Sequence, residues 1–201
     1  MKVIVIGATG TIGAAVVQAL AAKKHEVIGA SRRGELRVDI DDAASIRAMF
    51  ERAGEADAVI CCAGNAVFKP FAQLTDADYA LGLRSKLMGQ VAVARIAAER
   101  LRDGGAITLT TGILAMQPAP GSAAISLVNA GLEGFVRAAA LELPRRIRIN
   151  AVSPPWVTET LIQFGMDPGP GQPAAEVAQA YVASVEGAAQ GKIFDSRRLS
   201  Q

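Results

Sequence analysis

The chain has very few of the side chains on which metal and hydrolytic chemistry depends. Its 201 residues include one histidine, His25, and two cysteines, Cys61 and Cys62, which are adjacent. These residues leave almost no material for a zinc site or a Ser-His-Asp triad, so we expect no metal site. Adjacent cysteines cannot close a long loop through a disulfide bond, and such sparse usage favours a reducing, cytoplasmic location.

Strong charge and long apolar runs are also missing. The formal net charge of +2 is too small to indicate a nucleic-acid-binding surface. In the basic tract PRRIRIN at 144–150, arginine and isoleucine alternate as in a strand. We interpret the tract as a solvated turn that leads into a strand. The N-terminal run MKVIVIG is too short for a secretory signal, and no segment approaches the ~20 apolar residues of a membrane helix. We therefore expect neither a nucleic-acid nor a membrane partner.

What the chain does have is a regular alternation of strand-like and helix-like segments. This alternation predicts a single α/β domain over 1–201, a Rossmann-type doubly wound parallel sheet of about six strands with helices on both faces. Ligands of such sheets bind beyond the carboxyl ends of the strands. The strand-like segments are 3–6, 26–30, 58–62, 106–110, 148–152 and 192–194, and the helical ones are 11–22, 42–53, 84–101, 122–143 and 174–188.

The first strand runs into the glycine-rich segment GATGTIG, which opens a helix. Gly7 permits a tight turn, Gly10 lets a pyrophosphate approach the backbone, and Gly13 lets the helix pack on the sheet. The amides of Thr11 and Ile12 begin the helix, where its dipole favours an anion. With Thr9 in the same loop, this context of strand, glycines and helix indicates a dinucleotide site.

The second strand ends in GASRRG, and this segment bears on which dinucleotide is bound. A site for NAD usually has an acidic residue here to hold the ribose 2′-hydroxyl, but this chain has Ser31, Arg32 and Arg33. Two guanidinium groups suit the extra phosphate of NADP through charge-assisted hydrogen bonds. The alternative is a solvated turn with two exposed arginines. The absence of a carboxylate favours NADP.

With these motifs in place, the chain resembles the short-chain dehydrogenase/reductase family over nearly its whole length. Asp39-Ile40 looks like the pair that holds the adenine, and CCAG at 61–64 stands where the family has Asn-Asn-Ala-Gly beside the cofactor ribose. The stretch NAVSPPWVTET at 150–160 is similar to the loop that holds the nicotinamide, with Pro155 replacing a glycine. The resemblance therefore implies cofactor contacts from Asp39, Ile40, Cys62, Ala63, Gly64, Pro154, Val157 and Thr158.

One departure from the family affects the architecture. The family usually has a helix between its second and third strands, but here only SRRGELR separates Ala30 from Val38. A parallel crossover takes a dozen residues or more. We therefore expect the usual helix to be missing, and residues 35–39 to form an extended connector that delivers Asp39 to the adenine.

Other departures fall on the four positions that are catalytic in the family. Lys86 stands at the position of its Asn, Thr111 at that of its Ser, and Ile125 and Asn129 at those of its Tyr-x-x-x-Lys pair. The family's Tyr protonates the alkoxide that hydride addition creates, and a positioned acid contributes about 100- to 10,000-fold in rate. Ile125 cannot replace it, so we expect Ile125 to be a largely buried residue near the cofactor. Asn129 should lie within hydrogen-bond reach of the nicotinamide ribose.

The remaining candidates for the chemistry are Thr111 and Lys86. Thr111 could donate a hydrogen bond to an oxyanion, but its hydroxyl is a poor acid. Lys86 has two open placements: in the cleft, burial would lower its pKa and make it a usable acid, whereas on the surface its amine would stay in water.

The segments expected near the nicotinamide contain further residues that could contact the substrate. Glu159 either faces substrate or is a solvated loop carboxylate. The loop QFGMDPGPGQP at 163–173 is a predicted lid. Trp156, Phe164 and Met166 favour an apolar substrate.

Two functions are consistent with this sequence. The first is an NADP(H)-dependent oxidoreductase acting on a small carbonyl, alcohol or imine with an unusual proton donor. The second is a catalytically silent NADP(H)-binding sensor or partner-binding protein. Helices 84–101 and 122–143 are apolar around much of their circumference, and in the family these helices pair between subunits. The resemblance therefore implies a homodimer or homotetramer.

Overall fold

A parallel sheet of seven strands runs through the computed structural model of the protein, which describes residues 1–198. The strand order is β3-β2-β1-β4-β5-β6-β7, so the chain winds outward from β1 first in one direction and then, from β4, in the other. This confirms the Rossmann-type prediction. The strands are β1 Lys2–Ile6, β2 Glu26–Ser31, β3 Leu36–Arg37, β4 Ala56–Cys61, β5 Leu101–Thr110, β6 Arg148–Ser153 and β7 Ile193–Asp195.

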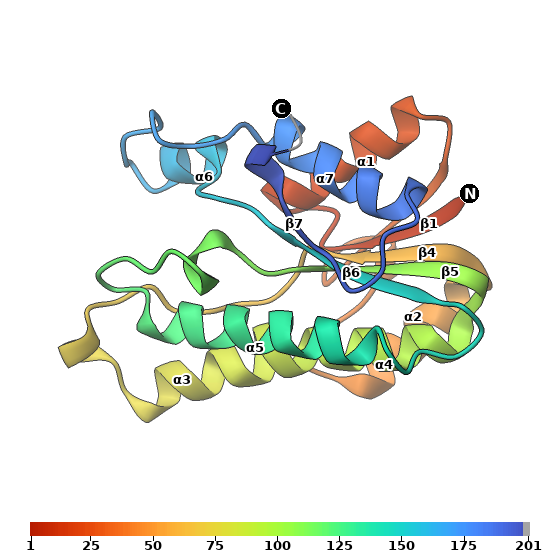
Figure 1. Ribbon diagram of the computed structural model, residues 1–201, viewed down its shortest axis with the longest axis horizontal. Helices are drawn as coiled ribbons and strands as arrows, with labels where there is room; N and C mark the ends of the chain where they lie inside the picture. Colours follow the sequence, from red (N-terminus) through yellow and green to blue (C-terminus); the bar gives the residue numbers. More distant parts are fainter. Residues whose placement is uncertain (199–201) are drawn as a thin grey trace.

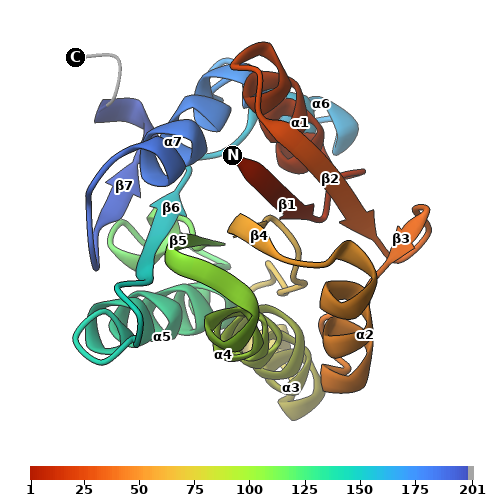
Figure 2. The same ribbon diagram turned by 90° about the vertical axis from the view of Figure 1, so that its right-hand side faces the viewer.

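Helices cover both faces of the sheet (Figure 2). The helices α1 (Thr11–Ala22) and α7 (Ala174–Glu186) lie on one face, and α2 (Ala43–Ala53), α4 (Gln90–Arg100) and α5 (Ala123–Ala139) lie on the other. The period of two in β1 divides its buried side chains between these layers. Val3 and Val5 pack in the core beside α1 and α7, while Ile4 and Ile6 pack in the core beside α2, α4 and α5.

The sheet has seven strands where about six were predicted, and β3 is the strand that was not predicted. No helix precedes it, as expected, but Leu36 and Arg37 pair in parallel with Ala30 and Ser31 of β2 instead of forming only a connector. The length rule for parallel crossovers applies when the chain must return along a whole strand. Here the pairing is confined to the carboxyl end of β2, so a tight turn over residues 32–35 is sufficient.

The helix predicted at 84–101 begins earlier and is not a uniform α-helix. It starts as α3 (Asp76–Gly82), continues as a π-helical segment over Leu83–Gly89, and ends as α4. Thr75 and Asp78 form a reciprocal capping box at the start, a signal that the sequence contains but that we did not use. A short helix, α6 (Thr158–Gln163), was also missed, and β5 begins at Leu101, earlier than the predicted strand.

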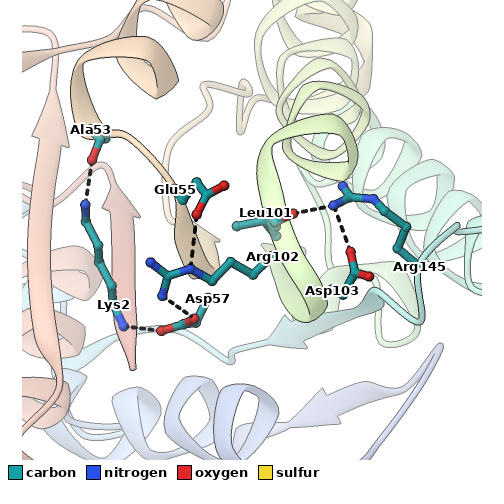
Figure 3. A network of polar contacts seen from close by, with 8 residues as sticks. All are labelled: Lys2, Ala53, Glu55, Asp57, Leu101, Arg102, Asp103 and Arg145. Carbon is teal, nitrogen blue, oxygen red and sulfur yellow. Dashed lines mark hydrogen bonds and ion pairs between the residues drawn. The ribbon is translucent and has the colours of Figure 1, made fainter.

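Figure 3 shows a polar network that connects the amino ends of β1, β4 and β5. The carboxylate of Asp57 accepts hydrogen bonds from the Lys2 amide at 2.6 Å and from Arg102 at 3.0 Å. Burial alone would raise the pKa of Asp57, but these two donors outweigh it and the pKa is lowered. The network therefore anchors the end of the sheet that lies opposite the expected ligand site.

Within residues 1–198, no helix has both the length and the apolar character needed to cross a membrane.

Candidate functional site

A cavity of about 490 Å³ opens at the carboxyl ends of β1, β2 and β4, where the strand order reverses direction. This is the place at which doubly wound sheets bind their ligands. The cavity wall contains eleven of the residues predicted to bind the cofactor: Gly7, Thr9, Gly10, Ser31, Arg32, Arg33, Asp39, Ile40, Cys62, Ala63 and Gly64.

The glycine-rich turn has the close backbone contacts that its sequence predicts. Gly7 has a φ of +84°, and a Cβ there would lie 2.9 Å from the carbonyl carbon of Cys62. A Cβ on Gly13 would lie 2.0 Å from the Gly7 oxygen, so any other residue would push α1 away from the turn. Gly10 caps α1 without a side chain, and no acidic residue occupies the first turn. The first amides, including those of Thr11 and Ile12, therefore favour an anion.

Two basic side chains and one buried hydroxyl meet at the end of β2. Arg32 and Arg33 are exposed, and neither takes part in an ion pair within residues 1–198. The Ser31 side chain is buried, and its Oγ has no hydrogen-bond partner among the described residues. A buried hydroxyl without a partner costs free energy, which a ligand oxygen in the cavity would relieve.

The side of the cavity predicted to hold the adenine is formed by the chain that follows β3. Ile40 is buried against the helix, since a Cβ on Gly89 would lie 3.0 Å from its side chain. Asp39 is exposed, and one of its carboxylate oxygens accepts the amide of Asp41 at 3.1 Å. Its other oxygen remains open to a donor from a ligand. Asp41 is in turn paired with Arg84 at 3.5 Å.

A second buried polar atom without a partner lies on α5. Asn129 is buried, and its Oδ1 has no hydrogen-bond partner within residues 1–198. Its Nδ2 lies 2.9 Å from where a Cβ on Gly112 would be, and the same Cβ would lie 3.8 Å from the Pro154 oxygen. Asn129 therefore faces the loops that follow β5 and β6. In the cavity itself, the glycine turn and the Ser31 hydroxyl leave polar groups for which a dinucleotide would supply partners, so the residues present fit that group.

The chain after β6 is fixed in place by backbone contacts. Pro154 is buried and its oxygen accepts the Ile113 amide at 2.9 Å. Val157 is buried and pairs with Gln172, whose oxygen accepts the Thr158 amide at 3.0 Å. Seven residues predicted to bind the cofactor are not part of the cavity wall: Thr11, Ile12, Gly13, Asn129, Pro154, Val157 and Thr158. Their cofactor contacts, like those of the eleven residues in the wall, stay predictions.

Lys86 occupies the π-helical segment, a distortion that is frequent at functional sites. Its side chain is half-buried and runs over Gly64, because a Cβ on Gly64 would lie 3.2 Å from the Lys86 Cβ and Cγ. Desolvation lowers the pKa of the amine to about 8, and the nearby thiols of Cys61 and Cys62 only partly oppose this shift. The cavity wall includes its neighbours Gly64 and Ser85 but not Lys86 itself, so the placement of the amine in the cleft stays a prediction.

Thr111 and Ile125 differ from their expected environments. The Thr111 side chain is buried, and its hydroxyl is within 3.5 Å of Glu133 and 3.3 Å of the Val152 oxygen, away from the cavity. Ile125 is half-buried, whereas we expected it to be largely buried. It lies at the rim of the buried face of α5, beside the fully covered Ala124 and Val128. Thr111 is therefore a weak candidate for oxyanion binding.

Several other residues have structural roles. The carboxylate of Glu159 accepts the Ala174 amide at 3.0 Å and so caps α7 instead of facing substrate. His25, in the turn between α1 and β2, is paired at 3.0 Å with Glu186, the last residue of α7. Burial raises the pKa of the Cys62 thiol to about 12, which leaves the group neutral. Within residues 1–198, no three metal-binding side chains converge.

Five residues of the cavity wall were not predicted from the sequence. The missed residues each lie within two positions of a predicted one: Ile6, Val38, Asp41, Asn65 and Ser85. The Asn65 amide donates to Ser85 Oγ at 3.2 Å, which joins the loop after β4 to the π-helical segment. This contact connects residues 20 positions apart, and no local pattern indicates it.

The fold and the cavity define a Rossmann-type dinucleotide-binding protein, and comparison with known proteins is more specific. A family model described as Enoyl-(Acyl carrier protein) reductase matches residues 6–185. A small-chain dehydrogenase in complex with NADPH has a TM-score of 0.87 and 28% identity, with 97% of this chain and 95% of that chain covered. The protein lin1944 from Listeria innocua has a TM-score of 0.91 and 40% identity, covering 96% and 98%. The chain belongs to the short-chain dehydrogenase/reductase family.

Curated relatives match over a shorter range. A hydroxynaphthalene reductase-like protein of Metarhizium brunneum is 32% identical over 130 residues, which are 62% of this chain and 49% of that protein. An uncharacterized oxidoreductase of Methylorubrum extorquens is 26% identical over 178 residues, which are 77% and 72% of the two chains. The match with the first of these relatives spans about half of that relative's length.

Proposed function

We propose that the protein is an NADP(H)-dependent oxidoreductase that uses Lys86 as its proton donor. The observation that supports the choice of cofactor is the end of β2, where the buried Ser31 hydroxyl, which has no partner among the described residues, lies beside Arg32 and Arg33. A 2′-phosphate would accept hydrogen bonds from all three, whereas a 2′-hydroxyl would leave two guanidinium groups unused. The amides at the start of α1 would hold the pyrophosphate.

The bound cofactor would supply the hydride, and the protein must supply the proton. An amine with a pKa of about 8 is mostly protonated at neutral pH and still releases its proton readily. In our proposal the Lys86 ammonium gives a proton to the oxygen or nitrogen that accepts it as hydride is added, and recovers one from water. Asn129 would hold the nicotinamide ribose through its Oδ1, which has no hydrogen-bond partner within residues 1–198.

The proposed substrate is a small carbonyl compound or imine, or the corresponding alcohol or amine in the reverse direction. The hydroxynaphthalene reductase-like relatives do not define the substrate more closely, because the match covers only about half of their length. A reducing, cytoplasmic location suits the two unpaired thiols.

The proposed assembly is a homodimer or homotetramer that pairs through α4 and α5. A groove of about 340 Å³ lies between these helices. Apolar residues of the same region are exposed to solvent, among them Met88 and Leu127 at 52% and 49%. A second copy would cover them. The groove is lined by Ala94, Arg95, Phe135, Ala138, Ala139, Glu142, Leu143 and Ile149.

A silent NADP(H)-binding protein is the second candidate, and the loss of the Tyr-x-x-x-Lys pair at Ile125 and Asn129 favours it. Oxidation of NADPH with a broad panel of carbonyls and imines separates the two. We expect turnover with at least one compound, and a Lys86→Met variant at least tenfold slower, equivalent to about 1.4 kcal/mol of barrier. An Ile125→Val control should retain full turnover. Failure of every compound despite tight NADPH binding would support the silent protein.

A further inference from the structure

We infer that Phe68 and Trp156 form an aromatic corner that selects a planar, uncharged aromatic substrate. This inference rests on the proposed function, since the corner would present the substrate beside the nicotinamide. The two rings are 5.3 Å apart between centroids and lie at 79° to each other. A flat ring that enters such a corner can stack on the face of one ring and point its own edge at the face of the other, the two arrangements that aromatic pairs prefer.

The corner is built from two loops that leave the same end of the sheet. Phe68 follows β4 and Trp156 follows β6, and the chain emerges from both strands at the end that holds the cavity (Figure 1). Trp156 is two residues from Pro154, which is in the neighbourhood of Gly112 and Asn129. Phe68 rests against Gly121, where a Cβ would lie 3.1 Å from its ring. Phe68 is thus in contact with both Gly121 and Trp156 in the absence of a ligand.

Both rings have exposed surface on which the aromatic ring of a ligand could pack. Phe68 is 46% exposed and Trp156 is half-buried, so the pair does not complete its own packing. Met116 and Phe164, from the loops after β5 and α6, are 72% and 68% exposed. Large apolar side chains on several of these loops are therefore exposed, as expected for a protein that binds an apolar ligand.

The charged groups nearest to the corner in sequence are already paired within the protein. The amine of Lys69 lies 3.0 Å from the carboxylate of Asp78, whose pKa is lowered to about 2 by the Thr75 amide and by Lys69. The carboxylate of Glu159 caps α7. Neither group is free to neutralise a charged substituent, and placing an unpaired charge beside the two rings would be unfavourable. The corner therefore suits a neutral ring.

Binding of a matched pair of ketones tests this inference. Calorimetry would compare 1-tetralone, which has a flat fused ring, with 1-decalone, its saturated counterpart, in the presence and absence of NADP⁺. We expect 1-tetralone to bind at least tenfold more tightly, and a carboxylated 1-tetralone to lose that advantage. Trp156 is the only tryptophan of the chain, so its fluorescence should be quenched by 1-tetralone.

Variants separate the corner from general hydrophobicity. Phe68→Leu should bring the two ketones to within threefold of each other. Phe71→Leu, which changes a phenylalanine that is 76% exposed three positions away, should leave the preference intact. Thermal melting would confirm that both variants fold, and Trp156→Phe should keep most of the preference because it retains a ring. Equal binding of the two ketones by wild-type protein that binds NADP⁺ would overturn the inference alone, whereas lack of NADP⁺ binding would contradict the proposed function.

Discussion

At the residue scale, the most informative feature is the exchange of side chains between two helices. The family has an asparagine on one helix and a lysine on the other, and this chain has Lys86 and Asn129 instead. The sequence identified both positions, because the motifs around them fix the alignment. It could not show that Lys86 runs over Gly64 or that Asn129 has a free Oδ1, because both facts depend on neighbours far away in the chain.

The lowered pKa of Lys86 predicts how stability depends on pH. The unfolded amine titrates near 10.5 and the folded one near 8, so the folded state binds protons less tightly. The resulting cost is fully present below pH 8 and disappears as the pH rises towards 10.5. Lys86→Met should therefore raise the free energy of unfolding at pH 7 by about 1–3 kcal/mol. Urea denaturation at pH 7 and pH 10 measures the gain, which should shrink at the higher pH.

The same group predicts the pH dependence of catalysis. Reduction requires protonated Lys86, so kcat for NADPH oxidation should fall as the pH rises above about 8. Lys86→Met should be slow and should lack this inflection. An unchanged inflection in Lys86→Met would mean that another group donates the proton.

At the element scale, the long, strongly patterned segments were predictable and the distorted ones were not. The run Val3–Ile6 gave β1 because a strand covered on both faces is apolar at every position. The π-helical segment at Leu83–Gly89 has no pattern of its own, since it arises where the helix packs on Ile40 and against α5. The strand β3 is two residues long and exists only because β2 offers a free edge.

The polar network at the amino end of the sheet predicts an acid-sensitive contribution to stability. Because the pKa of Asp57 is lowered, its contribution is present above about pH 4 and is lost as the pH falls through the folded-state value. Asp57→Asn should destabilise the protein at pH 7 by about 1–2 kcal/mol, since it weakens two charge-assisted hydrogen bonds. Urea titrations at pH 7 and pH 3 should show this difference shrinking in acid. Asp103→Asn, at a more exposed pair with Arg145, should cost less at pH 7.

At the scale of the whole molecule, the proposed assembly gives a test that leaves the monomer intact. A Cβ built on Gly134 meets no atom within 4 Å, so Gly134→Arg fits on α5, one turn from Ala138 of the groove. Replacing a helical glycine should not destabilise the monomer. Sedimentation should show wild type as a dimer or tetramer at micromolar concentration, and Gly134→Arg as a monomer. Gln18→Arg, on the opposite face of the molecule, is the matched control. A wild-type monomer would contradict the assembly.

The preference for NADP(H) over NAD(H) underlies the proposed function of the whole molecule. Calorimetric titration of the protein with NADPH and with NADH compares the two cofactors under identical conditions. We predict that NADPH binds at least tenfold more tightly, about 1.4 kcal/mol, and that replacing Arg32 and Arg33 with alanine removes most of this difference. The preference should weaken with added salt, because both guanidinium groups are exposed. Equal affinity of the wild-type protein for NADPH and NADH would contradict the account.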